Sequence, residues 1–589
     1  MRTIFAIPPR RPGFRPLASA VITLLAAASP MMGAESPKPI HPASLGTLDG
    51  AFYRNTAVPG RALAGGGLMW QIPEWMTQTD FPYRKKPFER ELPFADAVSL
   101  VRLLGGWENK NLPPDRRNDD TDLVGRDENG ALHYRWNLLK ERLDPYFTQG
   151  YELTLVMDNI PYALADPPQQ GHHGQVAPPA DPQEWYGFVR EMCREIKRLY
   201  GEQSAKRLRF RMGTEMQDQR RFTGTFEQYL AYYDFAAKAI KEELPGAAIG
   251  PFNRAVPDSP EGRTKGYSPG NVSLLGLARH CAEGRNTATG EIGSPFDFVA
   301  RSFYYFSEMK PNGAIHNVHP DQRMPEFQQV WQDVEKISPR YVGISREVHE
   351  LGPHLQTEEG LYGQDTGARG AAQTLHTLIG FREIGADRLW HWGVFERIHD
   401  DKILLMSRGW LYSILDRMRG GELFSPALSA AADHGNTRKA LLAVKPDEAI
   451  LLVANWNVDR IKNQPDILSV VLPQNSWKPV GMLRFDESNS VYDIIRRDLV
   501  EADLLHPKHA AHRGHPATHV AMGGYVSMAA DVGKGRNFVA KNWDKYLGLM
   551  KDSLTLKPFD GTVSADGGSL SFDAATPSVT AIVLRKEAQ

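Results

Sequence analysis

The chain has 589 residues, of which 41% are hydrophobic and 24% are charged, proportions that are ordinary for a globular protein. Its formal net charge is −1, so electrostatics give no support to a nucleic acid or an anionic membrane surface as its partner. The length predicts either several domains or one large barrel with an accessory domain.

The N-terminus has the pattern of a secretory signal peptide over residues 1–34. A region rich in arginine precedes an apolar run from Leu17 to Ala28, and small residues follow it. This run is too short to span a bilayer, and no later apolar run is long enough to do so. We therefore expect an exported protein, secreted or periplasmic, with no membrane partner. Residues 35–61 read as a linker and N-terminal segment.

Predicted strands and helices alternate between residues 62 and 420. Short apolar or alternating runs predict strands at residues 65–70, 97–104, 151–157, 207–212, 247–252, 296–302, 341–348 and 388–394. Apolar residues at spacings of three and four predict helices at residues 134–148, 185–200, 225–243, 325–337 and 370–384. About eight strands, each followed by a helix or a long loop, are typical of a (β/α)8 TIM barrel.

The stretch from Lys206 to Glu215 indicates where a catalytic group would lie in such a barrel. Leu208, Phe210 and Met212 alternate with arginines, which predicts a short buried strand that ends at the glutamate. Active sites of these barrels lie at the C-terminal ends of the strands. Glu215 is therefore a candidate catalytic residue.

From residue 421 onward the pattern changes to short strands separated by turn residues. Examples lie at residues 439–445, 449–455 and 578–585. They predict a β-sandwich accessory domain over residues 421–589, interrupted at about 484–550 by mixed helical and loop sequence. The expected fold class is α/β, a (β/α)8 barrel at residues 62–420 followed by this sandwich.

The chain has only two cysteines, Cys193 and Cys281, and an exported protein of this size does not need disulfides when its core is large. Cys193 lies on the apolar side of a predicted helix and is expected to be packed there. A disulfide between the two residues remains open.

The residues around Glu215 resemble a known family. The stretch Arg194–Gly201, the strand after it and Glu215 itself resemble the unit before the acid/base glutamate of clan A glycoside hydrolases, most of all family 39, the β-xylosidase and α-L-iduronidase type. Further stretches resemble that family at Phe226–Pro251, Phe296–Tyr304, His349–Gly352 and Trp390–Trp392. The resemblance covers roughly residues 95–420 and implies the same barrel fold.

The resemblance implies a retaining glycoside hydrolase that acts on a poly- or oligosaccharide, with Glu215 as acid/base and Glu350 as nucleophile. One carboxyl group protonates the leaving oxygen while the other bonds to the sugar, and the two lie about 5–5.5 Å apart. Glu347, together with Glu358 and Glu359 farther along, competes with Glu350 for the nucleophile role.

Two positions depart from the family pattern. Thr214 stands where the family has an asparagine that contacts the sugar 2-hydroxyl, and Ser302 stands where a histidine is typical. Both changes leave the two-carboxylate chemistry possible. They weaken the case for the xyloside and iduronide specificities of the family.

Seven residues are candidates for binding the sugar. They are Arg102, Trp107, Asn159, Thr214, Tyr304, Trp390 and Trp392. The aromatic and amide residues among them follow the predicted ends of strands, although each tryptophan could instead pack in the core. Arg102 falls inside a predicted strand and must be paired in a barrel interior, either near Glu215 or Glu350 or by substrate. The Tyr304 hydroxyl could donate a hydrogen bond to the nucleophile.

Two other functions remain open at this point. A carbohydrate-binding barrel that has lost catalysis is one, and Thr214 keeps it open. A metal-dependent hydrolase would require His506, His509, His512 and His515 to converge, but the intervening Pro, Gly and Ala do not predict a regular helix. We expect a carbohydrate partner, no nucleic acid, no metal and no cofactor; the sugar, its linkage and the oligomeric state are not specified.

Overall fold

A computed structural model describes most of the chain after residue 96 and two short segments before it. The described residues are 44–47, 67–71, 97–106, 122–147, 151–171, 174–253, 272–309, 315–317, 319–357, 362–364, 367–392, 397–399, 402–403, 407–459, 462–472, 477–504 and 532–586. The expected signal peptide, Trp107, Glu358, Glu359 and the late histidines lie outside them. No helix among the described residues is both long and apolar enough to cross a membrane.

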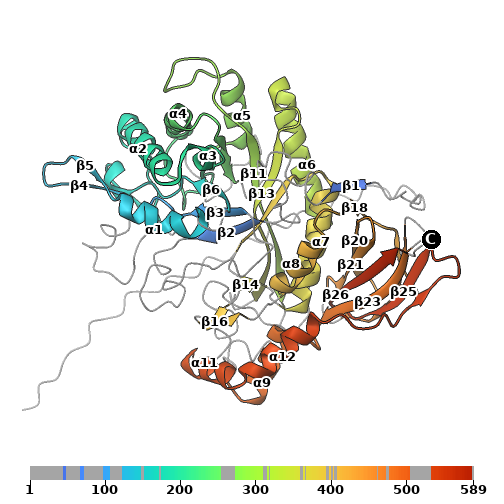
Figure 1. Ribbon diagram of the computed structural model, residues 1–589. Coiled ribbons are helices and arrows are strands. Elements are labelled where there is room, and N and C mark those ends of the chain that lie inside the picture. The colour runs from blue at the N-terminus through green and yellow to red at the C-terminus, as the bar shows by residue number, and fades with distance from the viewer. Residues whose placement is uncertain are drawn as a thin grey trace, which may run out of the picture. The chain divides into compact units, whose positions relative to one another are not determined.

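Eight parallel strands form the central sheet (Figure 1). They are β2 (Gly67–Gln71), β3 (Ala97–Val101), β6 (Glu152–Val156), β9 (Arg209–Thr214), β10 (Ala248–Asn253), β11 (Phe298–Met309), β13 (Ser345–Thr357) and β15 (Arg388–Trp392). Pairing runs in the order β10-β9-β6-β3-β2-β15-β13-β11, which is cyclic chain order. β10 and β11, at the two ends of this order, also meet, because Asn253 donates to the Ser302 hydroxyl at 2.7 Å.

Short antiparallel strands and ribbons extend this sheet or lie in its loops. They are β4 (Val124–Arg126), β5 (Leu132–Tyr134), β7 (Gln170–Gly171), β8 (Gly174–Gln175), β12 (Ile315–Asn317), β14 (Tyr362–Gln364), β16 (Arg397–His399) and β17 (Lys402–Ile403). β12 pairs with β11 and β14 pairs with β13, so both of those strands run beyond the ends predicted from the sequence.

Helices connect successive strands of the sheet, and the last one, α8, follows its final strand. They are α1 (Trp136–Phe147), α2 (Pro182–Tyr200), α3 (Glu202–Ala205), α4 (Phe226–Glu243), α5 (Leu274–Glu283), α6 (Pro320–Ile337), α7 (Ala368–Glu383) and α8 (Ser407–Arg417), with 3-10 turns at Tyr162–Leu164 and Pro339–Tyr341. Thr225 begins α4 with a capping box to Gln228. The prediction that the helix ending at Ile337 starts at Pro325 was wrong. This helix, α6, starts at Pro320, because the His319 side chain caps it there by accepting from the Asp321 amide.

The two faces of β9 have opposite chemistry, as the sequence alternation predicts. Phe210 and Met212 belong to the main hydrophobic core. The charged face is not solvated, however, because Arg209 and Arg211 are 5% and 0% exposed. Arg209 forms an ion pair with Glu347 on β13. The arginines of this strand therefore fill the inside of the sheet with paired charges.

The C-terminal part forms two antiparallel sheets. Their strands are β1 (Ser44–Thr47), β18 (Glu422–Phe424), β19 (Leu428–Ala430), β20 (Asn436–Val444), β21 (Glu448–Asn457), β22 (Asp466–Val471), β23 (Trp477–Asp486), β24 (Thr562–Val563), β25 (Ser569–Ala574) and β26 (Ser578–Lys586). The orders are β1-β18-β20-β21-β26-β23 and β19-β22-β25-β24. Residues 44–47, expected to be part of a linker, thus form an edge strand.

Strand β21 explains why its sequence is apolar without alternation. Leu451 and Val453 belong to a core shared with the second sheet, whereas Ile450 and Leu452 belong to the main core. Both faces of the strand are therefore covered. Helices α9 (Val491–Glu501), α11 (Val532–Lys541) and α12 (Trp543–Ser553) lie between β23 and β24 in the chain.

Both cysteines are buried free thiols, so the disulfide between Cys193 and Cys281 is absent. Each residue lies on the buried side of a helix, α2 and α5 respectively, and belongs to the main core.

Candidate active site

Three side chains of the site follow the C-terminal ends of neighbouring strands in a strained backbone conformation. Arg102, Asn159 and Glu215 come after β3, β6 and β9 and have φ values of 63°, 52° and 47°. Positive φ is uncommon for residues other than glycine and costs of order 1–3 kcal/mol. Such residues concentrate at functional sites, where the surrounding fold holds them. The strain therefore marks this rim of the sheet as a candidate active site.

The surroundings of Glu215 favour the protonated form of its carboxyl group. Its backbone amide donates to Asn253 Oδ1 at 3.3 Å, which ties the end of β9 to β10. Burial, and then the negative charge of Glu350, raise the pKa of Glu215 from 4.5 to about 7. Arg221, whose Nη2 lies 3.9 Å from Glu215 Oε2, acts in the opposite direction. A carboxyl group with this pKa can donate a proton near neutral pH.

Glu350 faces the same space from β13. It accepts a hydrogen bond of 2.5 Å from the Tyr304 hydroxyl on β11, and Arg211 Nη2 lies 4.0 Å from its Oε1. The charge of Glu350 acts on both Glu215 and Arg102. These contacts bring the two predicted catalytic glutamates together at one site.

A β-bulge in β13 turns Glu350 toward this site. Arg301 of β11 pairs with Val348, but the next residue of β11 pairs with Glu350, so His349 is an extra residue. Alternation alone would direct Glu347 and Glu350 to opposite faces of the sheet, because they are three residues apart. The bulge shifts the alternation by one residue, so both glutamates reach the inner side.

The expectation that Glu350 and Tyr304 lie where their strands end was wrong. β13 continues to Thr357 and β11 continues to Met309. Glu350 instead gains its special geometry from the bulge inside the strand. Pairing with β14 keeps the strand extended beyond Glu350.

Glu347, the competitor for the nucleophile role, is enclosed by its own partners. It is 0% exposed, forms an ion pair with Arg209 and accepts from Ser345 Oγ at 2.7 Å. His349 Nε2 lies 2.6 Å from its other oxygen. Burial alone would raise the pKa of Glu347, but Arg209, His349 and Arg388 lower it to about 2. Glu347 is therefore a structural anion, and Glu350 is the carboxylate that shares a site with Glu215.

A chain of hydrogen bonds links the rim residues. Arg102 pairs with Asp158 at 2.7 Å rather than with either glutamate, and burial lowers the pKa of its guanidinium to about 9. Thr214 Oγ1 donates to Asp158 Oδ2 at 2.7 Å and accepts from Arg211 Nη2 at 2.8 Å. Asn159 accepts from Arg102 at 2.5 Å. The threonine hydroxyl is thus already used within the protein.

Sequence reasoning missed Asp158, Arg211, Arg221 and Asn253. Asp158 carried a usable signal, because it follows the predicted strand at residues 151–157 directly. Arg211 carried none, because an arginine alternating with apolar residues ordinarily faces solvent.

Of the tryptophan candidates, only Trp390 has a described side chain, and it does not join this rim. Trp390 lies inside β15, is 1% exposed and clusters with Val101 and Val156 in the sheet interior. Its ring lies 4.4 Å from that of His349, which makes it a packing residue beneath the site. Trp392 is the last residue of β15, and its side chain is outside the described part.

Comparison with known proteins finds a family model that matches part of this chain. Residues 116–350, which include Glu215 and Glu350, match the model of Glycosyl hydrolases family 39. An alpha-1,4-L-rhamnosidase from Formosa agariphila is 28% identical over 163 residues, 26% of this chain and 33% of the relative. A beta-xylosidase from Caldicellulosiruptor saccharolyticus is 27% identical over 128 residues, 21% of this chain and 26% of the relative. The alignments thus span about a third and a quarter of these curated relatives.

The fold comparison covers more of the molecule. A monomeric beta-xylosidase from Caulobacter crescentus has a TM-score of 0.57 over 92% of this chain and 98% of that one, at 13% identity. Its likeness, with the cyclic strand order described above, shows a (β/α)8 barrel with a second domain.

Proposed function

We propose that this chain, which is most similar to glycoside hydrolase family 39, is an exported retaining glycoside hydrolase acting on a poly- or oligosaccharide. The observation that carries the proposal is the pairing of Glu215 and Glu350. Burial and the charge of Glu350 raise the pKa of Glu215 to about 7, so that one carboxyl group is a proton donor. Two carboxyl groups in different protonation states are what glycosidic cleavage requires.

The proposed reaction proceeds in two displacements. Glu215 gives its proton to the glycosidic oxygen while a Glu350 oxygen bonds to the anomeric carbon, and the bond to the leaving group breaks. Glu215, now ionised, takes a proton from water as that water attacks the same carbon and releases Glu350. The Tyr304 hydroxyl, 2.5 Å from Glu350 Oε2, holds the attacking carboxylate in place.

The substrate class is part of the proposal. The names of the two curated relatives make α-1,4-linked L-rhamnosides and β-xylosides the first compounds to test. Thr214 supports a difference from the xylosidases, because its hydroxyl already bonds to Asp158 and Arg211 and does not supply the amide expected at that position.

The alternative is a carbohydrate-binding barrel with impaired catalysis. It rests on the same residue: a threonine replaces the asparagine that would contact the sugar 2-hydroxyl. The raised pKa of Glu215 favours the enzyme, since a pure binding site has no need of a proton donor.

We further propose the division of the chain that the sequence predicted. Residues 1–34 are the signal peptide, residues 62–420 the catalytic barrel and residues 421–589 a β-sandwich with an insertion at about 484–550. The sandwich is supported by the hydrophobic core that the two C-terminal sheets share. Mass spectrometry of the protein recovered from an exporting host tests the cleavage near residue 34.

The central experiment compares wild type with Glu215→Gln and Glu350→Gln on rhamnosyl and xylosyl substrates. With a natural linkage, both variants should lose more than about a hundredfold in kcat/KM. With an aryl glycoside whose leaving group needs little protonation, Glu215→Gln should retain the first step and Glu350→Gln should not. Unchanged activity of Glu215→Gln on a natural oligosaccharide would refute the acid role.

Stereochemistry separates the retaining mechanism from inversion. Proton NMR of the first product formed should show the anomeric configuration of the substrate. Binding of oligosaccharide with no turnover by wild type would support the binding protein instead.

A further inference from the structure

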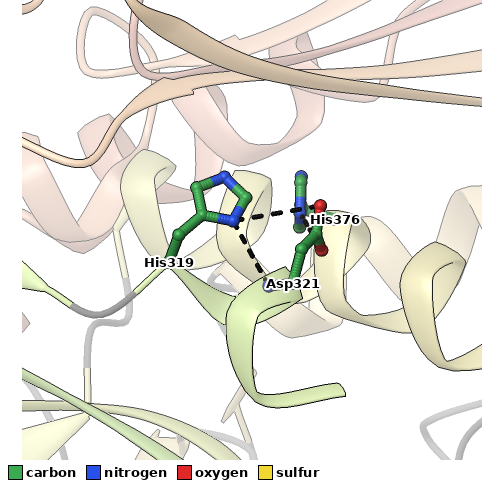
Figure 2. A group of neighbouring side chains, drawn as sticks. All are labelled: His319, Asp321 and His376. Carbon is green, nitrogen blue, oxygen red and sulfur yellow. Dashed lines mark hydrogen bonds and ion pairs between the residues drawn. The ribbon is translucent and has the colours of Figure 1, made fainter. Parts of the chain in front are cut away.

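A second cluster of charged and ligating side chains lies on helices α6 and α7. His319 caps the start of α6, Asp321 lies in its first turn and His376 lies in α7 (Figure 2). His376 Nε2 is 2.9 Å from Asp321 Oδ1, and His319 Nδ1 is 3.9 Å from Asp321 Oδ2. One ligating atom from each residue lies within 4.8 Å of the other two.

The ring of His319 is held in a tautomer suited to ligation. Its Nδ1 accepts from the Asp321 backbone amide at 3.2 Å, so Nδ1 carries the lone pair. Its Nε2 lies 3.0 Å from Thr437 Oγ1 on β20, which leaves the ring proton on Nε2. A hydrogen bond from the outer ring nitrogen to an oxygen is the usual support of a metal-bound imidazole.

The surroundings of the cluster combine an apolar wall with access from solvent. The Trp456 ring lies 5.9 Å from that of His319 and 5.7 Å from that of His376. His376 is 1% exposed, whereas the Asp321 side chain is 42% exposed. An ion and its remaining water ligand can therefore approach from the side of the carboxylate.

The charges near the cluster leave room for a cation. Lys439 Nζ lies 3.8 Å from Asp321 Oδ2, which opposes a second positive charge there. The same ammonium, however, forms a closer ion pair with Glu383. The carboxylates of Asp321 and Glu383 and the one ammonium together leave a net negative charge.

We propose that His319 Nδ1, the Asp321 carboxylate and His376 Nε2 bind one divalent transition-metal ion of the zinc type. Two imidazoles and a carboxylate with one open position suit such an ion. Bonds of about 2.0–2.2 Å place ligating atoms roughly 3–3.5 Å apart, so the side chains of His319 and Asp321 close by about 1 Å. Nδ1 of His376, which has no hydrogen-bond partner in the described part of the chain, takes the ring proton.

The ion would replace the hydrogen bond that His319 Nδ1 accepts from the Asp321 amide, and would instead tie the start of α6 to His376 on α7, which stabilises this side of the barrel. Its role is structural and independent of the glycosidase activity proposed above. Metal binding and thermal stability therefore test this site, and glycosidase activity does not.

The test uses the full chain, freed of metal with a chelator and titrated with Co²⁺, whose visible absorption reports its ligands. The ligand-field bands should show that wild type binds one more equivalent of Co²⁺ per chain than Asp321→Asn or His376→Gln binds. Zn²⁺ should displace these bands and raise the Tm of wild type. His280→Gln is the matched control, because His280 pairs with Asp234 at 2.9 Å without a second imidazole, and this variant should bind as wild type does.

Three results would overturn the proposal. One is equal Co²⁺ binding by wild type and both cluster variants, which would place any bound ion elsewhere in the chain. Another is no binding by wild type at all. The last is an increase in Tm on adding Zn²⁺ that is no larger for wild type than for Asp321→Asn. Because Asp321 is half-exposed, that variant is expected to fold, which circular dichroism can verify.

Discussion

The Tyr304 hydroxyl donates a hydrogen bond of 2.5 Å to Glu350 Oε2, joining two strands that lie next to each other in the barrel. This contact distinguishes Glu350 from Glu347, whose carboxylate is bound instead by Arg209 and Ser345. It holds one oxygen of the glutamate and leaves the other without a hydrogen bond in the described part of the chain.

Tyr304→Phe should lower kcat/KM by about tenfold to a hundredfold. Hydrogen bonds to charged groups contribute about 1.5–3 kcal/mol, and this one orients the attacking oxygen. Steady-state kinetics with an aryl glycoside measure the loss. Tyr341→Phe removes a hydroxyl that bonds to the Ala278 carbonyl at 2.8 Å and should leave kcat/KM unchanged. Equal kinetics for Tyr304→Phe and wild type would speak against Glu350 as the nucleophile.

The pH profile should report the proton on Glu215. Because its pKa is raised to about 7, the rate should fall as the pH rises through that value and the acid loses its proton. Arg221 lowers this pKa, so Arg221→Met should move the basic limb of kcat/KM to higher pH. Arg198→Met, which alters an exposed pair with Glu195, should not move it. A shift toward lower pH in Arg221→Met would contradict the assignment.

Glu347→Gln should destabilise the fold by about 3–5 kcal/mol, because it leaves the buried Arg209 without its ion-pair partner. Urea denaturation at neutral pH measures the cost. Glu335→Gln, which alters a partly exposed pair with Arg346, should cost about 0–1 kcal/mol. If Glu347→Gln were as stable as wild type, the paired interior described for β9 and β13 would be wrong.

Glu347 should also make the stability of the fold sensitive to acid. Its pKa is about 2 in the folded chain against 4.5 as the ordinary value, so its stabilisation is complete above pH 4.5. That stabilisation is lost as the pH falls from 4.5 toward 2, where the folded-state carboxylate takes up its proton. The stability difference between wild type and Glu347→Gln should therefore shrink over this interval, and an unchanged difference would contradict the lowered pKa.

Thr214→Val should cost about 1–3 kcal/mol of stability, and Thr214→Ser should cost less. Valine keeps the shape but removes one buried hydrogen bond from Arg211 and one from Asp158. Thermal unfolding of the two variants measures the difference. Because the same hydroxyl lies next to Glu215, kcat/KM should fall in the valine variant and largely recover in the serine variant. Equal stability of all three proteins would show that the hydroxyl is not bonded as described.

Local chemistry allowed most of the barrel to be predicted. Periodicity located the strands and helices, because each buries one side against a common core. Thr214 and Glu215 could be placed at the end of β9 for the same reason. The alternation of Phe210 and Met212 with arginines was also read correctly as a strand.

Three expectations failed, two of them where distant residues decide the outcome. Pairing with β12 and β14 lengthens β11 and β13 beyond their predicted ends. The cap from His319 begins α6 before Pro325. Pairing with β18 turns residues 44–47 from linker into strand. The expectation that Arg102 is paired was confirmed, but its partner, Asp158, is 56 residues away in the chain and could not be named from the sequence.

The sequence by itself determined a strand-helix barrel with Glu215 on its rim and a set of carboxylates near Glu350. Only the tertiary structure decided which carboxylate shares the site, because a bulge at His349 changes which way each side chain points. It also decided that the arginines of β9 lie inside, since Glu347 and Arg209 meet only when strands 138 residues apart come together. Such pairings depend on three-dimensional contacts and leave no local pattern in the chain.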